Sequence, residues 1–299
     1  MYNETMYERG NAPSAIRELF AYGMERKAQI GEDKVFDFSI GNPSVPAPDS
    51  VAETIRELAD MAPAQLHAYS AAQGLESTRA AIAENLNKRF GTHYTADNLY
   101  LTMGAAACLS ACFTALIKPG DEIIVIAPYF PEYRIWIEFA GGVCVEVPAR
   151  EDNFQIDLDA LEQAITEKTK AVVINTPNNP VGTVYTRETL EGLADVLVQA
   201  EQRFGHDIYL ISDEPYRELT YGVEVPWVPA IYPNTLVSYS WSKSLSLPGD
   251  RIGYVLVPNE VHDSREVYLA VCGAGRSLGY ICAPVFFQRV IERCVDEPT

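Results

Sequence analysis

The sequence predicts an α/β fold with three layers, in which helices cover both faces of a mostly parallel sheet. From about Tyr94 onward, short apolar runs of strand length alternate with helical patterns. The seven runs are "NLYLT", "EIIVIA", "VCVEV", "AVVIN", "IYLISD", "LVSYS" and "GYVLV". Most are continuously apolar, which is typical of strands that are buried on both faces.

The N-terminal part of the chain is expected to form an arm that contains a helix. Residues 12–31, "APSAIRELFAYGMERKAQIG", carry apolar side chains at helical spacing, namely Ile16, Leu19, Phe20 and Met24. Residues 37–48, "DFSIGNPSVPAP", are rich in Gly and Pro, so this stretch is expected to be irregular. It is the predicted link between the arm and the main body of the protein.

The clearest helix lies between the fourth and fifth apolar runs, in "TRETLEGLADVLVQAEQRFG". Thr186 can cap its N-terminus and Gly205 can end it. Its apolar face consists of Leu190, Leu193, Val196, Leu197 and Ala200. Strands that alternate with such helices form a parallel sheet, and ligands of these sheets bind at the carboxyl ends of the strands.

Composition and charge narrow the classes of partner and location. The net charge of −18 makes nucleic acid and anionic membranes poor partners, so a bound anion needs a local positive site. The six cysteines form no CxxC pair and have apolar neighbours, which predicts reduced thiols in a cytoplasmic protein. The four histidines lack ligand spacing, so we expect no metal site. We also expect no signal peptide and no membrane span.

Small residues follow the first apolar run, at the start of the next helix. Gly104, Ala105 and Ala106 would let a ligand approach the free N–H groups of that helix, where the helix dipole favours an anion. This arrangement predicts a phosphate cradle. The alternative is that the helix needs small residues to pack on the sheet.

Polar or aromatic residues follow three further runs. Asn179 in "TPNNPVG" has a side chain directed by the neighbouring prolines, or it belongs to an ordinary turn. Asp213 ends a buried strand, where a carboxylate needs a positive partner, and Arg217 is a candidate. Otherwise Asp213 caps the next helix. Phe130 in "PYFPEY" packs on a flat ligand or belongs to the core.

The segment "SYSWSKSLSLPGDRIGY" sets a lone lysine, Lys243, and a lone arginine, Arg251, among serines and apolar residues. One cofactor, pyridoxal 5′-phosphate (PLP), needs all of these groups together. Its aldehyde requires a lysine for a Schiff base, and its ring nitrogen requires a carboxylate. Its phenolic oxygen, ring and phosphate require hydrogen-bond donors, an aromatic neighbour and an anion cradle. The matching residues are Lys243, Asp213, Asn179 with Tyr216, Phe130, and residues 104–107 with Ser240 and Arg251.

The chain resembles the fold-type I, class I/II PLP-dependent aminotransferases, of which the aspartate aminotransferases are members. The resemblance rests on "NTPNNPVGTVY", "SDEPYREL" and the Lys243 segment, and it runs from about Asn11 to the last residue. It implies a large PLP-binding domain, with Lys243, Asp213 and Tyr216 as catalytic residues. The cofactor-binding residues that it implies are Gly104, Ala105, Ala106, Phe130, Asn179, Asp213, Tyr216, Ser240, Ser242, Lys243, Arg251 and Tyr69.

The resemblance also implies Gly41 and Asn179 as substrate-binding residues. Tyr69 would reach the cofactor phosphate of a neighbouring subunit, which implies a homodimer. Arg276 in "GAGRSLGY" falls where some family members place an arginine that reads the substrate side chain, or it has a structural role.

The resemblance divides the chain into three parts. Residues 1–48 would form the arm and part of a small domain, 49–282 the large domain, and 283–299 the start of a C-terminal small domain. Family chains continue into that domain, which carries the arginine that binds the substrate carboxylate. We therefore expect this chain to be a fragment in which the small domain is missing; the alternative is that another group binds the carboxylate.

The implied function is transfer of an amino group from an L-amino acid to a 2-oxo acid through a Lys243 Schiff base. Two alternatives remain open at this point. A PLP-dependent carbon–sulfur β-lyase would use the same residues, because elimination needs only a leaving group at the β-carbon. A PLP-binding fragment without turnover would also account for them.

Overall fold

The computed structural model describes residues 1–12 and 15–297, and it forms two compact units, Met1–Ser44 and Val45–Thr299. Residues 13 and 14 of the expected arm helix, and the last two residues of the expected C-terminal segment, lie outside the described part. The domain boundaries expected at residues 48 and 282 stay predictions.

The first unit contains the predicted arm helix. Its helices are α1 (Glu4–Asn11) and α2 (Ala15–Ile30), followed by the short 3₁₀ turn η1 (Glu32–Lys34). Lys27 on α2 forms an ion pair with Asp37 at 3.2 Å, within the irregular stretch that the Gly and Pro content predicts. The expected apolar residues of α2 lie on its surface, since Ile16, Leu19, Phe20 and Met24 are all exposed.

The second unit is built on a seven-stranded sheet, and each of the seven apolar runs forms one strand. The strands are β1 (Leu99–Thr102), β2 (Glu122–Ala127), β3 (Val143–Pro148), β4 (Thr169–Asn175), β5 (Tyr209–Asp213), β6 (Thr235–Ser240) and β7 (Gly253–Leu256). Their order in the sheet is β1-β7-β6-β5-β4-β2-β3. Strand β7 runs antiparallel to β1 and β6, and the other neighbours are parallel. The prediction of a mostly parallel sheet is confirmed.

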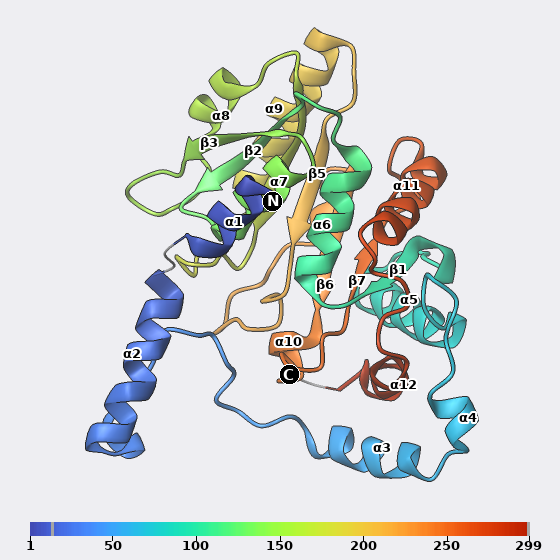
Figure 1. The fold of residues 1–299 in the computed structure, drawn as a ribbon. Coiled ribbons are helices and arrows are strands. Elements are labelled where there is room, and N and C mark those ends of the chain that lie inside the picture. Colours follow the sequence, from blue (N-terminus) through green and yellow to red (C-terminus); the bar gives the residue numbers. More distant parts are fainter. Residues whose placement is uncertain (13–14, 298–299) are drawn as a thin grey trace. The chain divides into compact units, whose positions relative to one another are not determined.

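Helices cover both faces of this sheet (Figure 1). The helices of the second unit are α3 (Asp49–Ala59), α4 (Pro63–Leu66), α5 (Glu76–Phe90), α6 (Ala105–Leu116), α7 (Glu132–Phe139), α8 (Leu158–Ala164), α9 (Arg187–Phe204), α10 (Trp241–Ser244), α11 (Ser264–Ser277) and α12 (Val285–Cys294). Two 3₁₀ turns, η2 (Ala96–Asn98) and η3 (Val228–Ala230), complete the set of described elements.

Alternate residues of each strand point to opposite faces and join different cores. On β4, Val173 packs in one core with α6, α7 and α11, and Val172 packs in another with α8 and α9. A third core joins α3, α5 and α12 to β1 and β7. The three-layer prediction is therefore confirmed.

The predicted helix α9 has the expected ends and the expected apolar face. The Thr186 hydroxyl accepts a hydrogen bond from the Thr189 N–H, and Gly205 ends the helix in the left-handed conformation. Leu193 and Leu197 are completely buried, and burial of each such side chain contributes about 1.5–3 kcal/mol. In the part of the chain that the structure describes, no helix is both long enough and apolar enough to cross a bilayer.

Two glycines of α11 give a matched test of the packing between this helix and β1. A Cβ at Gly275 would collide with the buried hydroxyl of Tyr100, whereas a Cβ at Gly273 would meet no atom within 4 Å. We expect Gly275→Ala to lower the free energy of unfolding by about 1–3 kcal/mol through overpacking. Gly273→Ala should raise it by up to about 1 kcal/mol, because alanine favours the helix. Urea denaturation measures both values, and equal effects would contradict the packing.

Candidate active site

A cavity of about 180 Å³ opens at the carboxyl ends of the central strands. Its wall comes from the N-terminus of α6, the segment around α7, the ends of β4 and β5, and the α10 turn. The residues from the sequence prediction that line it are Ala105, Ala106, Phe130, Asn179, Asp213, Tyr216, Ser240, Ser242, Lys243 and Arg251. The tertiary structure thus gathers side chains from five separate segments of the sequence.

The ends of three adjacent strands align in register. Asn175 of β4 pairs with Asp213 of β5, which pairs in turn with Ser238 of β6. The Asn175 side chain donates a hydrogen bond to the Asp213 carbonyl at 2.8 Å and accepts one from the Asn179 N–H at 2.6 Å. This bridge fixes the loop that carries Asn179 against the end of β5.

Asp213 is a buried carboxylate held by two hydroxyl groups. The Tyr133 hydroxyl donates to its Oδ2 at 2.6 Å, and the Ser238 hydroxyl donates to its Oδ1 at 3.1 Å. Burial raises the pKa of Asp213 to about 7, although the two hydrogen bonds act in the opposite direction. No described residue forms an ion pair with this carboxylate.

Arg217, the candidate partner of Asp213, pairs instead with Glu214. The Arg217 Nε lies 2.6 Å from Glu214 Oε2, and both side chains are buried. Consecutive residues at the end of a strand point to opposite faces, so Glu214 and Asp213 meet different neighbours. Arg217 also donates to the carbonyls of Val225 and Pro226, which holds the loop after β5.

Lys243 lies in the one-turn helix α10, directly after β6. Burial lowers the pKa of Lys243, and the positive charge of Arg251 lowers it further. Three residues before Lys243, the Ser240 hydroxyl donates to the Ser242 Oγ at 3.1 Å. A lysine with a lowered pKa is more often neutral near pH 7, which is the form that acts as a nucleophile or a base.

Gly104 and Arg251 form a close contact at the N-terminus of α6. Gly104 has φ +83°, and a Cβ there would lie 2.9 Å from Nη2 of Arg251. The Arg251 Nη1 also donates to the Pro248 carbonyl at 2.9 Å. Ala105 and Ala106 are the first helical residues, so their N–H groups have no partner within the helix. Two amide donors, a helix N-terminus and a guanidinium therefore lie close together, which is an arrangement that favours an anion.

Aromatic side chains close the cavity on the α7 side. The Phe130 ring packs edge-on against Tyr133 and Trp136, with centroid distances of 5.8 and 6.0 Å. Phe130 is held in this position by a cluster of rings and presents an aromatic surface to the cavity.

Gly104 and Arg217, whose contacts are given above, do not line this cavity, and three further residues named from the sequence do not line it either. Tyr69 is 95% exposed, and Arg276 is exposed in the last turn of α11. Gly41 belongs to the first unit. The roles expected for these three residues stay predictions.

The sequence prediction missed side chains that complete the site, namely Leu109, Tyr133, Trp136, Asn175, Pro248 and Ser238. Ser238 and Asn175 carried a detectable signal, because both are polar residues near the end of an apolar strand run. Tyr133 ends the aromatic stretch "PYFPEY", but that stretch does not indicate its hydrogen bond to Asp213. Trp136 carried no signal, since its position depends on how α7 packs against the sheet. Among the described residues, no group of three or more His, Cys, Asp or Glu side chains is arranged to hold a metal ion.

The cavity residues fit PLP, the cofactor that the resemblance implies. The buried carboxylate of Asp213 has no cationic partner among the described residues, and a protonated ring nitrogen would supply one. Lys243 would be the amine for the aldehyde, and its pKa is already lowered. A side chain at position 104 would fill the space beside the Arg251 guanidinium, where the phosphate would be held.

Comparison with known proteins gives concordant results for sequence and structure. The family described as "Aminotransferase class I and II" matches residues 33–278. A curated relative, the aspartate/prephenate aminotransferase of Thermus thermophilus, is 37% identical over 83% of this chain and 62% of its own length. The aspartate aminotransferase of Pyrococcus abyssi is 33% identical over 87% of this chain and 65% of its own length. The chain therefore spans less than two thirds of these curated relatives.

Solved structures agree over nearly the whole chain. An amino transferase from Eubacterium rectale has a TM-score of 0.96 at 58% identity, covering 99% of this chain and 75% of that one. The Thermus thermophilus aspartate aminotransferase with maleate has a TM-score of 0.83 at 30% identity, covering 99% and 73%. The family match spans most of the sequence, and the two folds superpose over nearly the whole chain. The chain belongs to the class I and II aminotransferase family.

Proposed function

We propose that this protein transfers an amino group from an L-amino acid to a 2-oxo acid, with PLP as its cofactor. The observation that carries the proposal is the convergence of Lys243, Asp213 and Arg251 on one cavity. The names of the relatives support it, since they are described as aspartate or aspartate/prephenate aminotransferases. The β-lyase alternative has no support among the relatives named above.

When bound, PLP supplies an electron-accepting ring that stabilises negative charge at the substrate α-carbon. The other steps would depend on residues of the chain. Asp213 would keep the ring nitrogen protonated by charge pairing. Lys243 would hold the cofactor's aldehyde carbon until the substrate amine displaces it. Its freed, neutral amine would then move the proton from the α-carbon to that cofactor carbon.

The remaining cavity residues bind and orient. Asn179 and Tyr216 would hydrogen bond to the phenolic oxygen, and the Phe130 ring would cover one face of the pyridine. The amides of Ala105 and Ala106, the hydroxyls of Ser240 and Ser242, and the Arg251 guanidinium would hold the phosphate, with Gly104 leaving the space for it.

We also propose a location and a subunit assembly for the enzyme. We infer a cytoplasmic homodimer, in which Tyr69 would reach the cofactor phosphate of the partner subunit. The exposure of Tyr69, and separately that of the apolar residues of α2, supports contact of each with another copy. The role of Gly41 in substrate binding rests on the resemblance alone.

Transfer of labelled nitrogen tests the function directly. The protein is incubated with PLP, a panel of ¹⁵N-labelled amino acids that includes aspartate, and 2-oxoglutarate. Mass spectrometry should find the label in newly formed glutamate. Pyruvate and ammonia released from a cysteine conjugate without an amino acceptor would instead identify a lyase. PLP absorbance without any transfer of label would identify a binding module.

A further inference from the structure

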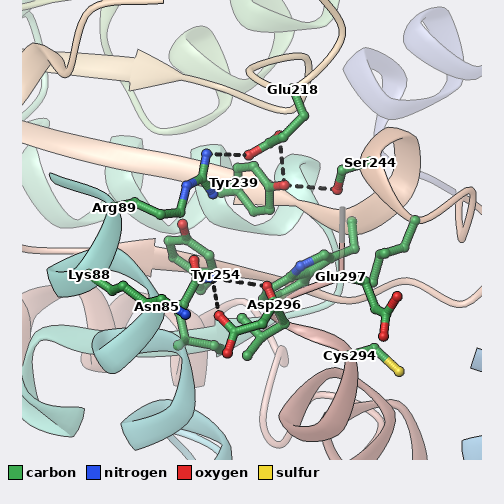
Figure 2. Close-up of a pocket in the computed structure, with 14 residues that line it drawn as sticks. Asn85, Lys88, Arg89, Glu218, Tyr239, Ser244, Tyr254, Cys294, Asp296 and Glu297 are labelled. Carbon is green, nitrogen blue, oxygen red and sulfur yellow. Dashed lines mark hydrogen bonds and ion pairs between the residues drawn. The ribbon is translucent and has the colours of Figure 1, made fainter. Parts of the chain in front are cut away.

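A second cavity of about 460 Å³ lies on the other side of the α10 turn, and Figure 2 shows its lining residues. Trp241, Ser244 and Leu245 line this second cavity, whereas Ser242 and Lys243 line the candidate active site. The turn that carries Lys243 is therefore a partition between two cavities. The position of the turn therefore depends on the residues that contact it from the side of the second cavity.

A chain of polar contacts crosses the wall of the second cavity and ends on this turn (Figure 2). The Arg89 guanidinium pairs with Glu218 Oε1 at 2.9 Å. The other oxygen of Glu218 lies 2.9 Å from the Tyr239 hydroxyl, which in turn lies 2.8 Å from Ser244 Oγ. Tyr239 and Ser244 are 6% and 8% exposed, so water competes little for the last link.

The direction of the protons in this chain follows from chemistry. A carboxylate accepts hydrogen bonds and cannot donate, so Tyr239 gives its single proton to Glu218. Ser244 must then donate its own proton to the Tyr239 oxygen. Each group has one defined role, and removal of the Tyr239 hydroxyl leaves both Ser244 and Glu218 without a partner on that side.

The α10 turn has little internal support of its own. It has four residues, and an isolated turn of this length is unstable. Its closing backbone bonds are long, at 3.3 Å from the Leu245 N–H to the Trp241 carbonyl and 3.2 Å from the Ser246 N–H to the Lys243 carbonyl. Side-chain bonds to the surrounding strands must therefore help to fix it.

We propose that Tyr239 is a positioning residue for Lys243, acting through Ser244 and anchored by Glu218 and Arg89. Ser244 is the residue next to Lys243 in the chain, so an effect of Tyr239 on catalysis rests on the proposed function. On the opposite side of the turn, the ionisable side chains that line the active-site cavity with Lys243 are Tyr133, Asp213, Tyr216 and Arg251. None of these four belongs to the Tyr239 chain, so a substitution at Tyr239 leaves them in place.

Tyr254 provides a matched control in the same wall. Its side chain is 4% exposed, lines the second cavity, and stacks on Tyr239 with ring centroids 5.2 Å apart. Unlike Tyr239, its hydroxyl forms no hydrogen bond with the described residues. Tyr239→Phe and Tyr254→Phe therefore remove the same group from neighbouring positions, and only the first breaks the chain.

The readout is the reactivity of Lys243 in the full chain without PLP. Acetic anhydride labels neutral amines, and peptide mass spectrometry gives the labelling rate of Lys243 as a function of pH. A loosened turn would move Lys243 toward water and away from Arg251, which weakens both causes of its lowered pKa. We expect Tyr239→Phe to raise the labelling midpoint by about half a pH unit, so that labelling at pH 7 slows about threefold.

Further variants separate positioning from a general loss of structure. Ser244→Ala should raise the midpoint as Tyr239→Phe does, and Ser244→Thr, which keeps the hydroxyl, should restore it. Tyr254→Phe should leave it unchanged. An unchanged midpoint in both Tyr239→Phe and Ser244→Ala, or an equal shift in Tyr254→Phe, would overturn the proposal.

The labelling result is independent of amino transfer. If wild-type protein transfers no nitrogen but Tyr239→Phe still shifts the Lys243 midpoint, the proposed function fails and the positioning role stands. If nitrogen is transferred and the midpoint does not move, the positioning role fails alone.

Discussion

Replacement of Lys243 by alanine is expected to abolish covalent attachment of PLP and to slow amino transfer by about 10⁴-fold or more. The side chain has two tasks in the proposed reaction, since it bonds the aldehyde carbon and then moves the α-proton. Among the described residues, no other lysine lines the cavity, so no other lysine is placed to take over either task. Borohydride reduction followed by peptide mass spectrometry should find PLP on the wild-type peptide and none on the variant.

Two controls make this result specific. Lys118→Ala removes an exposed lysine beyond the end of α6 and should leave both attachment and turnover unchanged. Lys243→Arg keeps the positive charge but supplies no amine for the aldehyde, so it should fail as the alanine variant does. PLP recovered on another lysine of the Lys243→Ala protein would show that the attachment site is elsewhere.

Asp213→Asn should reduce turnover by about 10²–10³-fold while PLP binding changes far less. Asparagine has the shape of aspartate and can keep contacts with Tyr133 and Ser238, but it carries no charge to hold the ring nitrogen protonated. Single-turnover rates and PLP titrations separate the two effects. Equal losses in rate and in affinity would show that Asp213 mainly binds the cofactor.

The same variant gives a second observable in protein without PLP, because the pKa of Asp213 is raised to about 7 from a value of 3.8. Between these pH values the folded chain keeps a proton that the unfolded chain releases. The resulting stabilisation is present below about pH 4 and is lost as the pH rises toward 7. Asparagine does not titrate, so wild-type protein should lose as much as about 4 kcal/mol relative to Asp213→Asn across this range. A difference that stays constant from pH 4 to 7 would contradict the raised pKa.

Much of the candidate site could be predicted because its residues lie in short sequence segments with a recognisable composition. Lys243 and Arg251 stand among serines and apolar residues within one short segment, and a parallel sheet brings the ends of its strands to a common edge. Residues chosen at those ends, such as Asp213 and Asn179, therefore line one cavity. In α9, Thr186 and Gly205 likewise indicated the two ends, and the apolar periodicity indicated the buried face.

Partners that depend on side-chain direction could not be predicted in the same way. Arg217 stands four residues after Asp213, yet it pairs with Glu214, because adjacent residues of a strand face opposite sides. The hydroxyls that do hold Asp213 come from Tyr133 and Ser238, 80 and 25 residues away in the sequence. Neither contact could be predicted from the separation of the two residues in the sequence.

The sequence by itself determined the strands, the α9 helix, the family and the residues at the strand ends. Each of these depends on residue type and local spacing, which a linear pattern records. Only the tertiary structure decided how the strands are ordered and, with that order, which side chains meet across them. The link from Arg89 through Glu218 and Tyr239 to Ser244 is of this kind. Its Arg89 end depends on strand order, because β1, which follows the helix of Arg89, lies on the β7 and β6 side of the sheet and away from β2.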